Sequence, residues 1–334
     1  MARRILIAGF ALVCLGLGVI VAGSLLSLDW SRTHSARTAS LPLLSDSTSQ
    51  GLVRIEANGL VFRARVAGLD SDGPGLILLH GYPETSAMWE PLVAAAAAAG
   101  YRVVAFDQRG YSPGARPEGV DAYRVGEMVV DVLAVADAAG FEDFHLVGHD
   151  WGCVVGWIAA VRHPERIRSW AGLSIPHPGP MIQQLQGGLP TYIKVFNTPW
   201  VPELLFSFGD FALLRRGLPE NEALRDEYVS VLAEPGALSA TLNWYRAIPS
   251  SLASFAGESF DVQPPTLFVW GSREGWVNAE RLERQRALMR GPYHELEVDA
   301  GHWLMQEQTR AVVERILGHL AAVDATAQPA ARSQ

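Results

Sequence analysis

The sequence predicts an α/β fold with a mostly parallel, doubly wound sheet and an inserted helical lid. Short apolar runs typical of buried strands alternate with helical segments from about residue 76 onwards. The alternation stops between about residues 178 and 260, where aromatic-rich helical segments follow one another without a strand, and then resumes. An insertion of this kind is typical of a cap over the carboxyl ends of the strands, where such sheets bind their ligands.

The composition is that of an ordinary globular protein and argues against several functions. Of the 334 residues, 49% are hydrophobic and 19% are charged, and the formal net charge is −8. Because no stretch is strongly basic, nucleic acid is not expected as a partner. The two cysteines, Cys14 and Cys153, can build neither a disulfide framework nor a cysteine-based metal site.

The apolar surplus lies at the N-terminus, where Ile5–Leu28 carries no charge and follows Arg3 and Arg4. About 20 apolar residues span a bilayer, whereas a secretory core has about 7–15. The length therefore favours residues 1–30 as a membrane anchor that leaves the folded domain outside the cytoplasm. Two alternatives stay open. Small residues at Val21–Gly23 could allow cleavage, which would give a secreted protein, or the start site is over-extended on a cytosolic enzyme.

Residues 31–50 are rich in serine and threonine and predict a flexible linker. The folded domain is expected over residues 51–325, with the lid at about 178–260. It begins with an expected antiparallel hairpin, because Leu52–Ala57 and Leu60–Val66 alternate apolar and polar residues around a glycine turn.

The remaining elements are expected as short strands and amphipathic or alanine-rich helices. The expected strands are Leu76–Leu79, Arg102–Phe106, Phe144–Val147, one ending near Leu173, Thr266–Trp270 and His294–Val298. The expected helices are Trp89–Ala99, Tyr123–Ala139, one beginning after Asp150, Ala279–Met289 and Gln306–Val323.

The segment Gly148–Gly152 reads Gly-His-Asp-Trp-Gly and lies between an expected strand and helix. In that context Gly-x-Ser-x-Gly forms a nucleophile elbow, a strained turn that needs small flanking residues. Here Asp150 occupies the serine position, and a carboxylate can attack carbon directly and form an alkyl ester. The alternative is an ordinary helix N-cap, a role that aspartate often has.

Two further segments follow the pattern of such an elbow enzyme. His80–Pro83 follows a strand at the place where a loop donates one backbone N–H to an oxyanion hole, so the amides of Tyr82 and Trp151 are the candidate donors. His302 lies between the last expected strand and helix, which fits the order nucleophile, acid, histidine. Taken alone, these segments also fit a Gly-Pro turn and a structural histidine.

The acid of this catalytic triad should lie in the loop after the strand Thr266–Trp270. Glu274 is the acidic residue of that loop, and its carboxylate could orient the imidazole of His302. The alternative is a solvated glutamate paired with Arg273.

Together these motifs resemble the epoxide-hydrolase branch of the α/β-hydrolase superfamily, from about Leu52 to Leu320. His80–Pro83 resembles the family's oxyanion motif and Asp107–Ser112 its loop after the next strand. Gly148–Gly152 resembles its nucleophile motif, and Gly301–Trp303 its histidine motif. As a set the four motifs are specific, although each one alone is not.

The resemblance implies two lid tyrosines that bind the epoxide oxygen. Tyr245 lies in a segment, Asn243–Arg246, that resembles the motif of one of them, and Tyr192 lies at the expected distance before Pro199 for the other. The alternative is that both are packing aromatics of the lid. The chain departs from the family at Glu274, where aspartate is usual, and the longer side chain must be accommodated.

The activity implied is hydrolysis of a small apolar epoxide by water to a vicinal diol. Asp150 forms the ester and His302 activates water, with no cofactor or metal. A haloalkane or haloacid dehalogenase is the nearest alternative, although Tyr82 and Trp151 stand where such enzymes are expected to have asparagine and arginine respectively. A non-enzymatic binding protein with a lid is a third interpretation.

Overall fold

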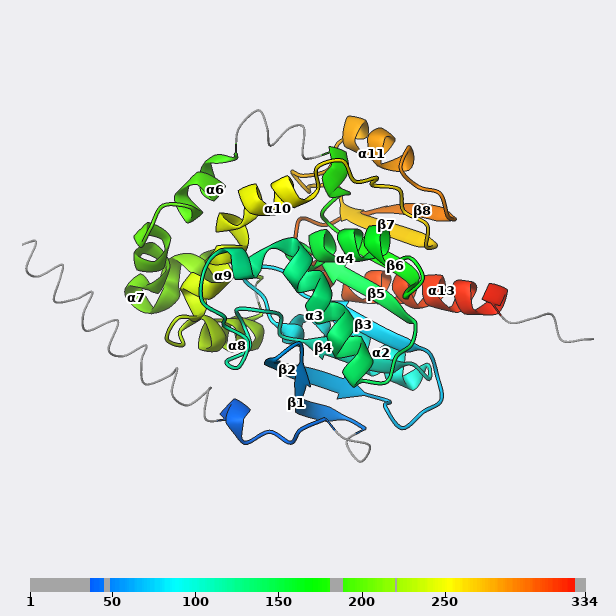
Figure 1. Ribbon diagram of the computed structural model, residues 1–334, viewed down its shortest axis with the longest axis horizontal. Coiled ribbons are helices and arrows are strands. Elements are labelled where there is room, and N and C mark those ends of the chain that lie inside the picture. The colour runs from blue at the N-terminus through cyan, green and yellow to red at the C-terminus, as the bar shows by residue number, and fades with distance from the viewer. Residues whose placement is uncertain (1–36, 45–48, 181–188, 220, 328–334) are drawn as a thin grey trace, which may run out of the picture.

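The computed structural model describes residues 37–44, 49–180, 189–219 and 221–327. Within these residues, eight strands form one sheet in the order β1-β2-β4-β3-β5-β6-β7-β8 (Figure 1). The first hairpin is antiparallel, β2 pairs antiparallel with β4, and all later pairs are parallel. The strands are β1 (Gly51–Ala57), β2 (Leu60–Ala67), β3 (Gly75–Leu79), β4 (Arg102–Phe106), β5 (Phe144–His149), β6 (Ile167–Leu173), β7 (Thr266–Gly271) and β8 (Tyr293–Val298).

The central strands are the uninterrupted apolar runs of the sequence. β3, β5 and β7 are buried along their whole length, because helices cover both faces of a parallel sheet. α3 and α4 pack together on one face, and α2 and α13 on the other (Figure 1). These helices and their neighbours are α2 (Glu90–Ala98), α3 (Val125–Ala138), α4 (Trp151–Arg162), α11 (Ala279–Arg286), α12 (Leu304–Glu307) and α13 (Thr309–Ala327).

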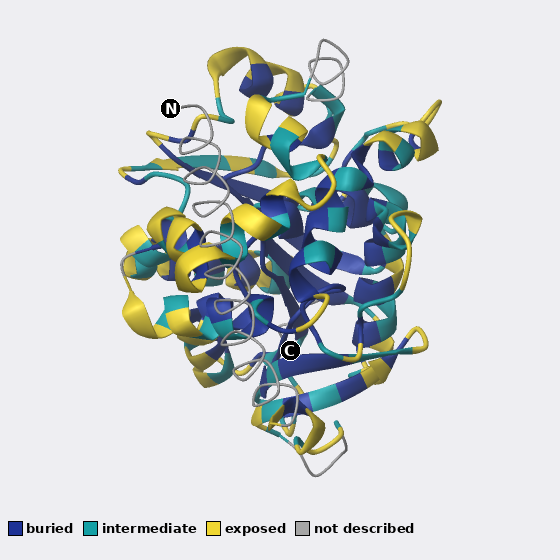
Figure 2. Cartoon of the chain, turned by 90° about the vertical axis from the view of Figure 1, so that its left-hand side faces the viewer, coloured by how far each residue is buried: buried dark blue, intermediate teal, exposed yellow. Residues whose placement is uncertain are grey.

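The lid lies between β6 and β7 in the sequence and at one end of the sheet in space (Figure 1). Because β6 and β7 pair directly, the chain leaves the sheet and returns to it at neighbouring strands. Figure 2 shows the contrast in burial between the sheet and the outer surfaces of the helices. The described lid helices are α6 (Thr191–Phe196), α7 (Val201–Gly217), α8 (Glu222–Leu232), α9 (Ala237–Arg246) and α10 (Ile248–Ser254).

Polar contacts fasten the lid to the sheet. Glu227 of α8 accepts hydrogen bonds from Arg63 at 2.6 Å and from Arg65 at 3.1 Å, and both arginines lie on β2. The indole N–H of Trp244 on α9 donates to the carbonyl of Arg109 at 2.8 Å. These contacts fix α8 and α9, so a side chain on α9 has a defined position over the strand ends.

The predicted fold class is confirmed, with local differences. The helix expected over Gln306–Val323 is two helices, α12 and α13, because the backbone of Gln308 is not helical. Part of the expected linker lies against the domain, since Leu43 forms a parallel bridge with Arg54 of β1.

The prediction of a transmembrane anchor, with a folded domain held outside the cytoplasm, is wrong. Among the residues that the structure describes, no helix is long and apolar enough to cross a membrane. The longest described helix, α13, has 19 residues, but it carries Arg310, Glu314 and Asp324, and a spanning helix tolerates few such charges. The run Ile5–Leu28, from which the prediction came, lies outside the described residues.

Candidate active site

Asp150 lies in the tight turn between β5 and α4. Its backbone has φ 51° and ψ −118°, a conformation that non-glycine residues rarely adopt. A Cβ atom at Gly148 would collide with the backbone of Gly152, and one at Gly152 would collide with the backbone of Leu79. Only glycine therefore fits at positions 148 and 152, two residues before and after Asp150. The turn presents the Asp150 carboxylate at the carboxyl end of β5.

The two oxygens of the Asp150 carboxylate have different surroundings. Oδ1 accepts a hydrogen bond from the backbone N–H of Tyr82 at 2.7 Å. Oδ2 lies 3.6 Å from Nε2 of His302. Burial would raise the pKa of Asp150, but the hydrogen bond and charge of His302 outweigh it and hold that pKa below its usual value. The carboxylate is therefore ionised at neutral pH.

Trp151, the second candidate oxyanion donor, follows as the first residue of α4. The first N–H groups of an α-helix have no acceptor within the helix, so the Trp151 amide is available to an external oxygen. Helix N-termini also favour negative charge. The structure thus places both candidate amides beside Asp150, one of them already bound to its carboxylate.

Glu274 contacts the other side of the His302 ring. Its Oε2 lies 2.6 Å from Nδ1 of His302, and its Oε1 accepts from the backbone N–H of Trp276 at 3.1 Å. Burial would raise the pKa of Glu274, but the hydrogen bond with His302 lowers it overall. The pairing with Arg273 that would have made Glu274 a surface residue does not occur, because Arg273 pairs with Asp299 and Glu307.

His302 therefore lies between two carboxylates. Burial alone would lower its pKa, but the hydrogen bonds and negative charges of Asp150 and Glu274 raise that pKa to about 10. The imidazole is thus protonated at neutral pH while Asp150 keeps its charge.

The sequence patterns do not identify two residues that hold the backbone of His302. The carbonyl of His302 accepts from Nε2 of His149 at 2.9 Å and from Oγ of Ser174 at 2.9 Å. Nδ1 of His149 lies 2.9 Å from Oε2 of Glu84, and both side chains are fully buried. A carbonyl only accepts, so Nε2 of His149 is the donor in its hydrogen bond to His302. The sequence held one indication of these residues, because His149 lies within the motif Gly148–Gly152 and Glu84 directly follows the motif His80–Pro83.

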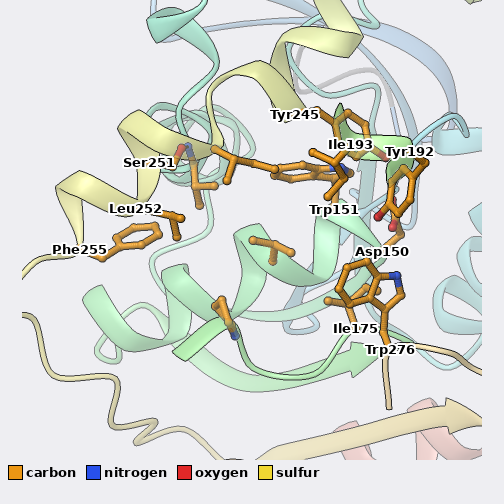
Figure 3. A pocket seen from close by; sticks show the side chains of 14 residues that line it. Asp150, Trp151, Ile175, Tyr192, Ile193, Tyr245, Ser251, Leu252, Phe255 and Trp276 are labelled. Atoms are coloured by element: carbon orange, nitrogen blue, oxygen red, sulfur yellow. The ribbon is translucent and has the colours of Figure 1, made fainter. Parts of the chain in front are cut away.

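A pocket between the lid and the sheet domain opens onto Asp150, as Figure 3 shows. Tyr192 from α6 and Tyr245 from α9 line it near the carboxylate, with ring centroids 6.3 Å apart. Burial and the charge of Asp150 raise the pKa of both phenols above the usual value. Both therefore remain protonated and can donate hydrogen bonds.

The assembled groups are a partly buried carboxylate, an imidazole held by a second carboxylate, two phenols and two backbone amides. Such a set can perform nucleophilic displacement at carbon and subsequent ester hydrolysis. Within the described ranges, no group of three or more His, Cys, Asp or Glu residues is arranged to hold a metal ion.

Comparison with known proteins places the chain in a family. A family model described as the alpha/beta hydrolase fold matches residues 74–198. The chain is 31% identical over 315 residues to Epoxide hydrolase A of Mycobacterium tuberculosis, covering 81% of this chain and 97% of the relative. It is 33% identical over 280 residues to the AB hydrolase superfamily protein YfhM of Bacillus subtilis, covering 80% and 96%.

A solved structure gives the same result at the level of the fold. The crystal structure of Epoxide Hydrolase A from Mycobacterium thermoresistibile superimposes with a TM-score of 0.70 at 28% identity. The match covers 82% of this chain and 98% of that one. The sheet order, the inserted lid and these relatives agree with one another: the chain belongs to the epoxide-hydrolase branch of the α/β-hydrolase superfamily.

Proposed function

We propose that this protein hydrolyses a small apolar epoxide to a vicinal diol through a covalent alkyl ester on Asp150. The observation that carries the proposal is the meeting of an ionised carboxylate, Asp150, with the phenols of Tyr192 and Tyr245 at one end of one pocket. A nucleophile and two proton donors are what ring opening of an epoxide requires.

In the first half of the reaction, Oδ2 of Asp150 attacks an epoxide carbon. The C–O bond of the ring breaks, its electron pair stays on the oxygen, and a phenol of Tyr192 or Tyr245 supplies the proton that makes a hydroxyl. Oδ1 stays on the Tyr82 amide at 2.7 Å and becomes the carbonyl oxygen of the ester. The amide thus selects which oxygen attacks.

Ester formation changes the charge beside His302. Asp150 becomes neutral, so it no longer holds the imidazole proton by charge, and the pKa of His302 falls from its resting value of about 10. The proton that His302 releases returns to the phenolate, which replaces the proton that the phenol gave to the ring oxygen. The imidazole is then a free base, oriented by Glu274 at 2.6 Å.

In the second half, His302 takes a proton from water and the oxygen attacks the carbonyl carbon of the ester. The amides of Tyr82 and Trp151 bind the tetrahedral oxyanion. When the intermediate collapses, the diol oxygen leaves with the proton from His302. The remaining proton of the water passes from the Asp150 carboxyl to His302, which restores the carboxylate and the protonated imidazole of the resting site. The sum is one epoxide and one water converted to one diol.

Single-turnover mass spectrometry in ¹⁸O-labelled water tests this route. With enzyme in excess over 1,2-epoxyhexane, label should enter the peptide that contains Asp150, and the diol should carry none. The Asp150→Asn variant should give no covalent adduct and serves as the control. Label in the diol alone would show direct attack by water and would overturn the proposal.

A haloalkane or haloacid dehalogenase is the second candidate, because Trp151 and Trp276 line the pocket beside Asp150 and indole N–H groups can bind a departing halide. Halide release from 1-bromohexane, measured beside diol formation from 1,2-epoxyhexane, separates the two. Faster halide release than diol formation would assign the protein to the second class.

A further inference from the structure

We infer that the pocket selects epoxides that carry one extended, uncharged alkyl group, which binds in an arm of the pocket directed away from Asp150; the inference rests on the proposed function. Figure 3 shows this arm: Ser251, Leu252 and Phe255 lie at the opposite end of the pocket from Asp150, Tyr192 and Trp276. We define the distal arm by its lining residues Val125, Val154, Ile248, Ser251, Leu252 and Phe255.

The walls of the distal arm come from both parts of the fold. α10 of the lid and the residue that follows it contribute Ile248, Leu252 and Phe255, while α3 and α4 contribute Val125 and Val154. All five side chains are apolar. Burial of alkyl groups against such walls is favourable in proportion to the area removed from water.

The one polar side chain of the arm is already engaged. Oγ of Ser251 accepts a hydrogen bond from the backbone N–H of Val125 at 3.1 Å, at the first turn of α3. This bond joins the lid to the sheet domain across the arm and satisfies a helix-terminal amide. Among the described residues that line the pocket, Asp150 is the only charged one, so the described walls of the arm offer no partner to a charged tail.

The arm ends at Phe255. The guanidinium of Arg162 lies 5.1 Å from the centre of the Phe255 ring and is itself paired with Glu258 at 2.7 Å. This cation covers the ring and is held by its own ion pair. We therefore expect the gain from a longer alkyl chain to stop at a definite length.

The space on another side of the reactive groups is filled by aromatic packing. Phe196 packs against Tyr245 with centroids 4.8 Å apart and against Tyr82 at 5.7 Å, and Tyr82 packs against Tyr245 at 5.3 Å. Neither Phe196 nor Tyr82 is among the residues that line the pocket. An alkyl group on one epoxide carbon can enter the distal arm, whereas a group on the other carbon would meet these packed rings. A terminal epoxide with a single chain therefore fits best.

A chain-length series tests the arm in the full-length protein. From 1,2-epoxybutane to 1,2-epoxyhexane, kcat/KM should rise by about fourfold for each added methylene, the factor expected for burial of one such group, and should reach a plateau with longer chains. trans-Epoxides with an alkyl group on each carbon should react more slowly than terminal epoxides of equal carbon number. A flat series would overturn the inference.

Substitution at Leu252 gives a sharper test. Leu252→Trp fills the arm, so its loss in kcat/KM should grow with chain length and exceed about tenfold for 1,2-epoxydecane. Leu252→Ala should move the plateau to longer chains. Ala253→Trp is the matched control, because Ala253 neighbours Leu252 on α10 but is exposed. Equal losses at all lengths, or the same pattern in the control, would contradict the assignment.

Binding of product-like diols separates this inference from the proposed function. The dissociation constants of alkane-1,2-diols, measured by calorimetry, should fall with chain length in the wild type and respond less in Leu252→Trp. If epoxides react through Asp150 but neither kcat/KM nor diol binding depends on chain length, the assignment of the distal arm is wrong and the proposed function stands. If no epoxide reacts, the function fails, and diol binding alone decides on the arm.

Discussion

The imidazole of His302 and the carboxylate of Asp150 face each other as an ion pair, with Nε2 3.6 Å from Oδ2. The pair raises the pKa of His302 to about 10 and lowers that of Asp150. The resting site therefore holds a proton on His302, the residue that acts as the base in the proposed reaction. Loss of the negative charge of Asp150 lowers the pKa of His302, so that the proton is released.

The Asp150→Asn variant mimics the neutral ester and should lower the pKa of His302. Loss of a negative charge at this distance shifts a pKa by roughly one to three units, so the imidazole should titrate nearer to neutral pH. Nuclear magnetic resonance of the His302 ring in both proteins measures the change. Identical titration curves would exclude control of His302 by Asp150.

The same pair makes stability depend on pH. The folded pKa of His302 lies above its ordinary value of 6.5, so the stabilisation is fully present below about pH 6.5 and is lost as the pH rises towards 10. The free energy of unfolding of the wild type should fall across this window. In Asp150→Asn the fall should be smaller, as urea unfolding at several pH values would show.

His302→Gln should separate the two halves of the proposed reaction. Alkylation of Asp150 needs no base, whereas hydrolysis of the ester does. Added epoxide should therefore give a stoichiometric burst of covalent enzyme, detectable as a mass increase on the Asp150 peptide, without steady turnover. Turnover at the wild-type rate would show that His302 is not the base.

Glu274 should be needed for ester hydrolysis but not for ester formation. Glu274→Gln removes the charge that orients the His302 ring, and orienting carboxylates contribute up to about 10⁴ in rate. Glu274→Asp keeps the charge on a shorter side chain, so its effect on the rate of ester hydrolysis should be small. Stopped-flow measurement of both half-reactions tests this, and an unchanged hydrolysis rate in Glu274→Gln would mean that another acid serves.

The two phenols should act in alkylation. Tyr192→Phe and Tyr245→Phe should each slow ring opening, by analogy with the roughly 2.7–4 kcal/mol cost of deleting a donor to developing charge. The double variant should lose nearly all activity. The melting temperature serves as the control, because phenylalanine has nearly the same volume. Normal ring opening by the double variant would remove the reason to prefer epoxides over haloalkanes.

Gly81 should tolerate no side chain. A Cβ atom there would collide with Cβ and Oδ1 of Asp150, whereas one at Gly275, in the Glu274 loop, would meet open space. Gly81→Ala should displace the carboxylate and reduce kcat/KM by roughly 100-fold, as small misplacements of reacting groups do. Gly275→Ala is the matched control and should be nearly silent. Equal activity of the two variants would show that the turn can relax.

The sequence predicted the fold, and the proximity of three of its candidate site residues, for a physical reason. Buried parallel strands are continuous apolar runs, so the expected strand Arg102–Phe106 has the same bounds as β4. Loops after parallel strands meet at one edge of the sheet. The order of the motifs along the chain was therefore enough to predict that Asp150, Glu274 and His302 come together, which the distances show.

The remaining features depend on three-dimensional contacts that no local pattern contains. The pair Glu84 and His149 acts on the carbonyl of His302, which lies more than 150 positions further along the chain than His149. The break at Gln308 interrupts a segment whose composition is helical throughout.

Because the lid is inserted between two directly paired strands, the candidate site residues fall into two groups that come from different parts of the chain. Asp150, Glu274 and His302 belong to the loops of the sheet, whereas the phenols of Tyr192 and Tyr245 and most of the distal arm belong to the inserted segment. Because β6 and β7 stay neighbours whatever joins them, one insertion can be exchanged for another without disturbing the register of the sheet. A change within this single contiguous stretch would thus alter the proposed substrate contacts and leave Asp150, Glu274 and His302 in place.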